Sequence, residues 1–152
     1  MKRRDAMATV NELLREKGRV GPVSVAPAAS VLEATTLMNS HGIGSLLVVD
    51  GPRLVGIFTE RDVLRRVVAA CLSPELTRVG EVMTADLVCC STEARVEEIA
   101  DVMRRRRIRH IPVIDANEEV VGVVSIGDIN AYHANSCEAE LHQVQDYIFN
   151  RA

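Results

Sequence analysis

The sequence is poor in aromatic residues and contains no tryptophan. Aromatic residues make up 3% of the 152 positions, so the core has to be built from aliphatic side chains. Proteins that bind single-stranded nucleic acid usually stack the bases on aromatic rings. A formal net charge of −3 also opposes attraction to nucleic acid or to an anionic membrane. We therefore expect neither kind of partner.

Clustered cysteines and long apolar runs are missing as well. No cysteine pair has a zinc-binding spacing, so we expect buried free thiols and no metal; the four are Cys71, Cys89, Cys90 and Cys137. No apolar run approaches the length of a membrane span. The basic residues 2–4 are not followed by the apolar segment of a secretory signal. These absences favour a cytoplasmic protein.

One motif is present in two copies. Residues 56–62 read GIFTERD and residues 122–128 read GVVSIGD, so each copy ends an apolar strand in a hydroxyl residue, Thr59 or Ser125. An aspartate follows three positions later, in the first turn of an expected helix. Backbone N–H groups at a helix start favour anions, and a carboxylate can accept both hydroxyls of a ribose. The pair indicates a site for a phosphorylated, hydroxylated small molecule; the structural alternative is a capped helix with an acid in its first turn.

The surroundings of the motif are duplicated too. Val31 matches Val96 at an offset of 65 residues, and Asp62 matches Asp128 at an offset of 66, because the second turn is one residue longer. A constant offset through helices, strands and turn indicates an internal duplication. One half alone would bury too little surface to be stable. We therefore expect two α/β repeats that are related by a pseudo-twofold axis, share one core and leave ligand clefts between them.

Each repeat is expected to have the element order β-α-β-β-α. Capping boxes at Thr9 and Ser30 start two helices, whereas the matching helix of the second repeat starts near Arg95 or at Thr92. The expected strands are residues 23–25, 46–49, 54–58, 87–90, 111–114 and 120–124. The chain then divides into a disordered start (1–8), a first repeat (9–72), a second repeat (73–135) and an amphipathic C-terminal helix (136–152).

The duplication, the two motifs and the stretch from Arg109 to Asp115 together resemble a tandem pair of cystathionine-β-synthase (CBS) domains, also called a Bateman module. Stand-alone bacterial pairs of this kind look like regulatory or signal-transduction proteins and not like enzymes. The resemblance implies an α/β module that binds an adenosine nucleotide, with AMP, ADP, ATP or NAD as candidates, and that assembles as a homodimer. A regulated protein partner is implied but not identified.

The resemblance also implies two sites, because the aspartate of one repeat typically serves the pocket that the other repeat lines. The first site would combine Thr59, Arg61, Asp62, Thr84, Ile108, Arg109 and His110. The second would combine Ser125 and Asp128 with residues 18–20, Val20 included, and with Ile43, Gly44 and Ser45. In each site the acid would take the ribose hydroxyls, and the Ser or Thr would take phosphate or ribose.

The two sites are expected to differ in charge. Arg61 and Arg109, with His110 as a further candidate, favour a phosphate-rich ligand in the first site. The second site offers no matching cation, so we expect it to be empty or to take a less charged ligand. The alternative to a nucleotide sensor is an oligomerisation or protein-interaction module with vestigial sites. No Ser/His/Asp or Cys/His set points to catalysis.

Overall fold

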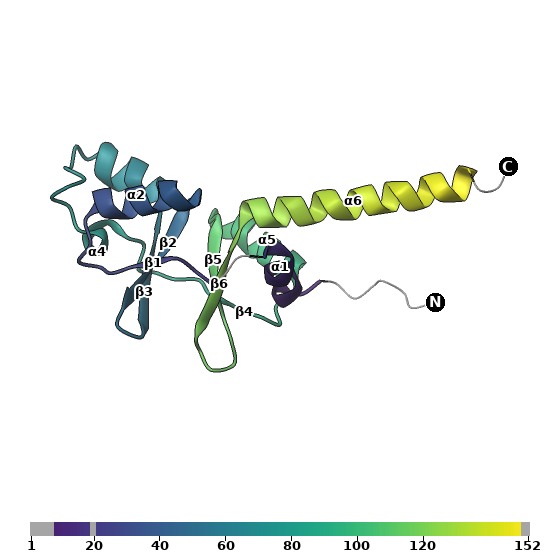
Figure 1. Cartoon of the computed structure of the whole chain (residues 1–152), viewed down its shortest axis with the longest axis horizontal. Coiled ribbons are helices and arrows are strands. Elements are labelled where there is room, and N and C mark those ends of the chain that lie inside the picture. Colours follow the sequence, from purple (N-terminus) through teal and green to yellow (C-terminus); the bar gives the residue numbers. More distant parts are fainter. Residues whose placement is uncertain (1–7, 19–20, 150–152) are drawn as a thin grey trace.

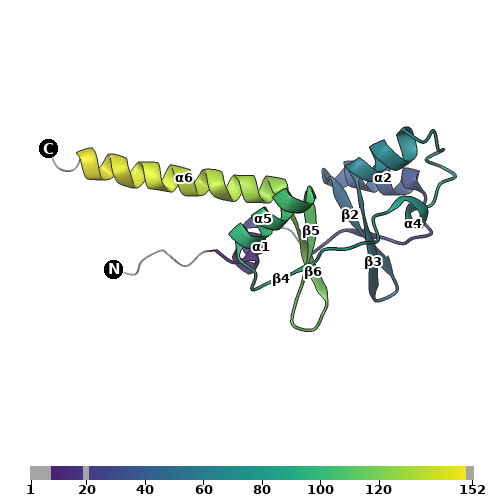
Figure 2. The same ribbon diagram turned by 180° about the vertical axis from the view of Figure 1, so that it is seen from behind.

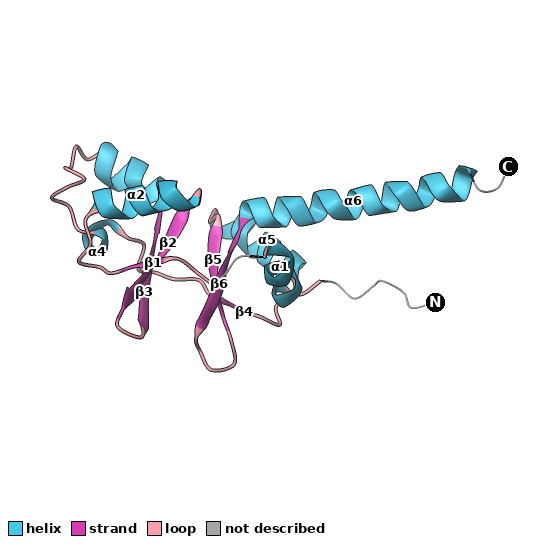
Figure 3. Cartoon of the chain, in the orientation of Figure 1, coloured by secondary structure: helices cyan, strands magenta, loops and turns pink. Residues whose placement is uncertain are grey.

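Residues 8–18 and 21–149 are described by the computed structural model, which has two α/β lobes (Figure 1). The strands are β1 (Ser24–Val25), β2 (Ser45–Asp50) and β3 (Arg53–Thr59) in the first lobe, and β4 (Cys90–Ser91), β5 (His110–Ile114) and β6 (Val120–Ser125) in the second. The helices are α1 (Val10–Lys17), α2 (Val31–His41), α3 (Glu60–Asp62), the π-helix η1 (Val63–Val68), α4 (Val79–Val82), α5 (Val96–Arg106) and α6 (Ile126–Phe149). Figure 3 shows the two sheets side by side, each with helices next to it. The α/β class expected from the sequence is confirmed.

The duplication seen in the sequence is repeated in the strand pairing. Each sheet has a short first strand parallel to the middle strand, which forms an antiparallel hairpin with the third. Val48 pairs with Gly56 in the first hairpin, and Val113 pairs with Gly122 in the second. Both hairpins have a register irregularity directly after these pairs. The two motifs therefore end equivalent strands in equivalent registers.

Buried side chains form two clusters, one in each lobe, where the sequence led us to expect one shared core. The reason is an exchange of helices. Val10 and Leu13 of α1 join the cluster of the second lobe, whereas Val79 and Val82 of α4 join that of the first. Backbone hydrogen bonds also tie the start of α1 to the segment before α5, and the start of α4 to the segment before α2. Each lobe thus depends on a helix from the other half of the chain.

Several local expectations differ from the structure. The helix of the second repeat starts at Val96 with Arg95 at the N-cap, so a start at Thr92 is wrong; the Arg95 N–H donates to the Glu98 carboxylate. In place of the strand expected at residues 87–90, the structure has only the two-residue strand β4, Cys90–Ser91. The helix after the first motif becomes a π-helix after three α-helical residues. The short helix α4 was not expected, because four residues are too few to show a periodic pattern.

The expectation of buried thiols holds for one cysteine only. Cys90 is buried, and burial together with the neighbouring Cys89 raises the pKa of its thiol to about 11, which keeps it protonated. The other three cysteines are exposed. Cys71 lies in a turn at a positive φ of 55°, and Cys137 lies on the projecting helix α6, so neither reaches a core.

Helix α6 is a single helix that leaves the second lobe and extends beyond it (Figure 2). The separate C-terminal helix expected from residue 136 is therefore continuous with the helix of the second motif; residues 150–152 lie outside the described part. Leu141, Val144 and Ile148 form the expected apolar stripe, and they are 61%, 55% and 61% exposed. Among the described residues, no helix combines the length and the apolar character that crossing a membrane requires.

Candidate functional site

Both copies of the motif form reciprocal helix caps. The Thr59 hydroxyl accepts from the Asp62 N–H at 3.3 Å, and the Thr59 N–H donates to the Asp62 carboxylate at 3.0 Å. The same two bonds join Ser125 and Asp128, at 3.2 and 2.8 Å. Because each side chain satisfies a free N–H of the other residue, the motif stabilises the strand-to-helix turn. The structural alternative is thus correct locally, and any binding role comes in addition to it.

The first motif also lines a cavity of about 480 Å³, here called the Asp62 cavity. All seven residues assigned to the first site line it: Thr59, Arg61, Asp62, Thr84, Ile108, Arg109 and His110. They come from the end of β3, from α3, from the segment after α4 (Thr84), and from residues 108–110, which lead into β5. Further lining residues are Gly44, which was assigned to the second site, and Ile57, Glu60, Leu64, Arg65 and Arg107, which were assigned to neither. The volume falls within the range of about 300–1,000 Å³ that is usual for small-molecule sites.

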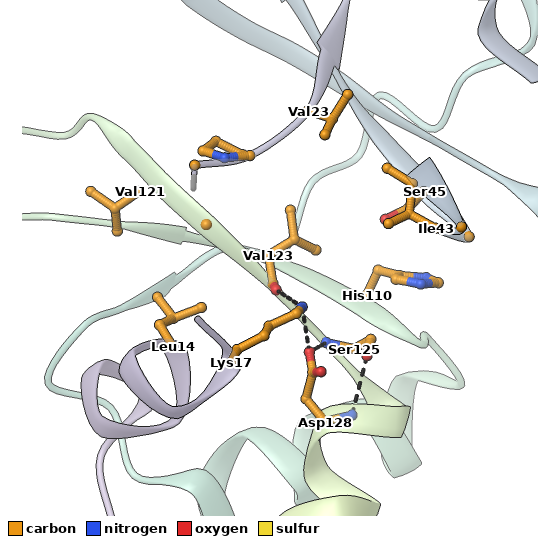
Figure 4. Close-up of a pocket in the computed structure, with 15 residues that line it drawn as sticks. Leu14, Lys17, Val23, Ile43, Ser45, His110, Val121, Val123, Ser125 and Asp128 are labelled. Atoms are coloured by element: carbon orange, nitrogen blue, oxygen red, sulfur yellow. Dashed lines mark hydrogen bonds and ion pairs between the residues drawn. The ribbon is translucent and has the colours of Figure 1, made fainter. Parts of the chain in front are cut away.

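The second motif lines a smaller cavity of about 210 Å³, here called the Asp128 cavity (Figure 4). The structure places Ile43, Gly44, Ser45, Ser125 and Asp128 around it, whereas Val20 lies outside the described residues. Gly44 and His110 line both cavities, so the two adjoin each other. With this volume the Asp128 cavity lies below the usual size of a small-molecule site.

The expectation that the second site has no cation is wrong, because Lys17 supplies one. Its ammonium group lies 2.7 Å from the Asp128 carboxylate and also donates to the Val123 carbonyl at 3.0 Å (Figure 4). Burial alone would raise the pKa of Asp128, but hydrogen bonds from Lys17 and Ser125 outweigh it and hold that pKa below its ordinary value of 3.8. Lys17 is the last residue of α1 and directly precedes the segment 18–20 that was assigned to this site. This adjacency in the sequence could have identified Lys17 as a site residue.

Asp62 has a different partner in the equivalent position. Its carboxylate accepts from the Thr84 hydroxyl at 3.0 Å and lies 3.7 Å from the Arg66 guanidinium, and the residue is only 5% exposed. Lys17 ends α1 and Thr84 follows α4, so the two exchanged helices deliver these partners. The partner that the exchanged helix brings to Asp62 is therefore a neutral hydroxyl, with Arg66 farther away at 3.7 Å, whereas the one it brings to Asp128 is an ammonium group at 2.7 Å.

Arginines surround the Asp62 cavity. Four of them line it against two carboxylates: Arg61, Arg65, Arg107 and Arg109 against Glu60 and Asp62. His110 is not a fifth cation, because burial lowers the pKa of its imidazole and keeps it neutral at pH 7. The positive charge expected at this site thus comes from arginines alone. One of them, Arg61, also donates to the Arg107 carbonyl at 2.9 Å and so links the two lobes.

Arg107 occupies a backbone position that usually requires glycine. It ends α5 in the left-handed region at φ 54°, and the equivalent residue at the end of α2 is Gly42 at φ 60°. An L residue with a Cβ is strained there, at a cost of about 1 kcal/mol. The run of arginines from residue 104 hid this position in the sequence, because such a run is typical of a solvated face.

Comparison with known proteins agrees with the two-lobed fold. A protein-family model described as CBS domain matches residues 9–69 and 79–134. The chain is 33% identical over 148 residues to the CBS domain-containing protein CBSX3, mitochondrial, of Arabidopsis thaliana; the match covers 92% of this chain and 71% of that protein.

Two solved structures of similar proteins have the same fold. A CBS-domain containing protein from Agrobacterium tumefaciens is 33% identical with a TM-score of 0.77, covering 83% of this chain and 99% of that one. A CBS domain protein from Pyrobaculum aerophilum, solved in complex with AMP, is 30% identical with a TM-score of 0.70, covering 80% and 89%. Since the family model matches both halves of the sequence and the structure shows both repeats, this chain belongs to the CBS domain family and carries two copies of the domain.

Proposed function

We propose that this chain is a regulatory module that binds an adenosine nucleotide in the Asp62 cavity. The observation that carries the proposal is the cavity itself: it lies between the two lobes, has the size of a small-molecule site, and combines a buried carboxylate with four arginines. A nucleotide presents hydroxyls that suit a carboxylate and phosphates that suit guanidinium groups. The similar protein from Pyrobaculum aerophilum was solved with AMP, which supports this class of ligand.

The side chains suggest how such a ligand would lie. A ribose hydroxyl would donate to the Asp62 oxygen that now accepts from the Thr84 hydroxyl. The adenine would lie between Ile57 of the first lobe and Ile108 of the second, which line the cavity from opposite halves of the chain. The phosphates would then point toward the arginines. Each part of the ligand would meet a group of matching chemistry.

Regulation would follow from contact with both lobes. A ligand that touches the two lobes at once binds best to one relative orientation of them, so it shifts the population toward that orientation. In a homodimer the same shift would change the surface offered to a regulated protein. The module needs no chemical step for this role, which agrees with a regulatory protein that is not an enzyme.

Thermal unfolding with AMP, ADP, ATP, NAD and S-adenosylmethionine tests the proposal. A ligand at a hundred times its Kd should add about 2.7 kcal/mol to the free energy of unfolding, which raises the Tm by several degrees. Asp62→Asn should abolish most of this rise. Asp128→Asn removes the same charge from the equivalent position of the other repeat, and it should leave the rise in place. A wild-type Tm that none of these ligands changes would contradict the proposal.

A second candidate, an interaction module with vestigial sites, is favoured by one observation. Large apolar side chains are exposed on two helices: Leu64 and Val68, at 64% and 61%, and the α6 stripe. An interaction module would keep its self-association in sedimentation experiments when Asp62 is replaced, and no nucleotide would change that association. A nucleotide-dependent change in the association that Asp62→Asn abolishes would favour the sensor.

A further inference from the structure

Three arginines form a rim between the Asp62 cavity and a neighbouring cavity. This neighbouring cavity, which differs from the Asp128 cavity, lies between α5 and α6 and has a volume of about 780 Å³. It is called the α5–α6 cavity below. Arg61, Arg107 and Arg109 line both cavities. A ligand that extends from the Asp62 cavity into the α5–α6 cavity therefore crosses a boundary formed by these arginines.

The rim keeps its positive charge. Acidic residues of the α5–α6 cavity are engaged elsewhere: Asp101 forms ion pairs with Arg104 and Arg105, and Glu97 lies 2.8 Å from the His133 ring. Within the described part of the chain, no salt bridge involves the three rim arginines, and Arg61 donates to a neutral carbonyl. Their charge is thus available to an anion.

Arg107 stands out within the rim because its backbone conformation favours glycine. The first repeat has Gly42 at the equivalent position, so the fold itself does not require a side chain there. The Arg107 side chain is exposed, and it lies where the two cavities meet. The backbone strain is therefore found at a place where a ligand can reach the side chain. Strained residues of this kind are concentrated at functional sites.

We propose that Arg107 recognises a phosphate chain, and that the ligand of the Asp62 cavity is a nucleoside di- or triphosphate. The inference rests on the proposed nucleotide site and specifies its ligand. A ribose at Asp62 directs the first phosphate toward the rim, and only a longer chain reaches along the rim toward the α5–α6 cavity. A planar guanidinium suits this task, since it can bind two phosphate oxygens at once.

The test compares the binding of adenosine, AMP, ADP and ATP by wild-type protein and variants in calorimetric titrations. Arg107→Gly should weaken ADP and ATP by about tenfold, the usual effect of losing a charge-assisted hydrogen bond, and should change the affinity for adenosine by less than about twofold. The same variant should raise the Tm of the free protein by a few degrees, because glycine relieves the backbone strain. Arg107→Asn, which tolerates the left-handed region without a charge, should weaken ADP and ATP equally.

Arg106→Gln is the matched control. It removes the same charge one residue earlier, from a side chain that lines neither cavity, and it should leave all affinities within about twofold of wild type. Equal binding of ATP by wild type and Arg107→Gly would overturn the inference while leaving the nucleotide site intact. Wild-type protein that binds none of the four compounds would overturn both the inference and the proposed function.

Discussion

At the scale of single residues, the partners of the two aspartates distinguish the two cavities. Asp62 accepts from a hydroxyl, which a ribose hydroxyl can replace without loss of a charge interaction. Asp128 is bound to an ammonium group at 2.7 Å, so a ligand that uses this carboxylate has to compete with an ion pair. Together with its smaller volume, this pairing makes the Asp128 cavity the poorer candidate for a nucleotide.

The ion pair predicts a pH-dependent contribution of Lys17 to stability. The pair is about four-fifths buried, with side chains 21% and 19% exposed, so Lys17→Met should lower the free energy of unfolding at pH 7 by roughly 1–2 kcal/mol. The folded pKa of Asp128 lies below 3.8, so this contribution is present above 3.8 and is lost as the pH falls from there through the folded pKa. Urea denaturation of wild type and variant from pH 7 downward measures it. A difference that stays constant down to the acid limit of folding would contradict this assignment.

At the scale of elements, the exchange of α1 and α4 decides which lobe each helix stabilises. Val10 belongs to the first repeat by sequence, but its side chain is fully buried in the second lobe. Val79 follows the first repeat, but it is fully buried in the first lobe. Neither placement could be predicted from periodicity, because an apolar helix face shows that a helix is covered and not by which sheet.

Matched alanine substitutions test the exchange. Val10→Ala and Val79→Ala should each lower the free energy of unfolding by about 2 kcal/mol, through lost burial and the cavity left behind. Val10→Ala should also speed amide hydrogen exchange mainly in β5 and β6, whereas Val79→Ala should speed it mainly in β2 and β3. If each substitution instead loosened the lobe nearest to it in sequence, the exchange of helices would be disproved.

Also at this scale, the sequence allowed prediction of whatever recurs at a fixed offset. The two capping motifs and the paired strands could be located because a duplication shows which positions are equivalent. The seven residues that line the Asp62 cavity were assigned from the resemblance to CBS domains. Lys17 was missed because it contacts Asp128, 111 positions away in the sequence, and because the residue that takes its place next to Asp62 is the uncharged Thr84. Arg107 was missed because its backbone conformation, and not its side chain, sets it apart.

At the scale of the whole molecule, the two adjoining cavities and the projecting helix α6 make the two lobes unequal. The Asp62 cavity is lined by residues of both lobes, and Figures 1 and 2 show α6 extending from the second lobe only. α6 begins directly after Ser125 with the turn that holds Asp128, and it borders the Asp128 cavity, which shares Gly44 and His110 with the Asp62 cavity. A change in lobe orientation at the Asp62 cavity would therefore move the apolar stripe of α6 relative to the first lobe.

The most direct test of the central claim is a crystal structure of the chain grown with ATP. The account predicts ATP in the Asp62 cavity, with a ribose hydroxyl on the Asp62 carboxylate, adenine between Ile57 and Ile108, and the phosphate chain against Arg107. It also predicts that the Lys17–Asp128 ion pair stays intact. A nucleotide bound at Asp128 in place of Lys17, with the Asp62 cavity free of nucleotide, would contradict the account.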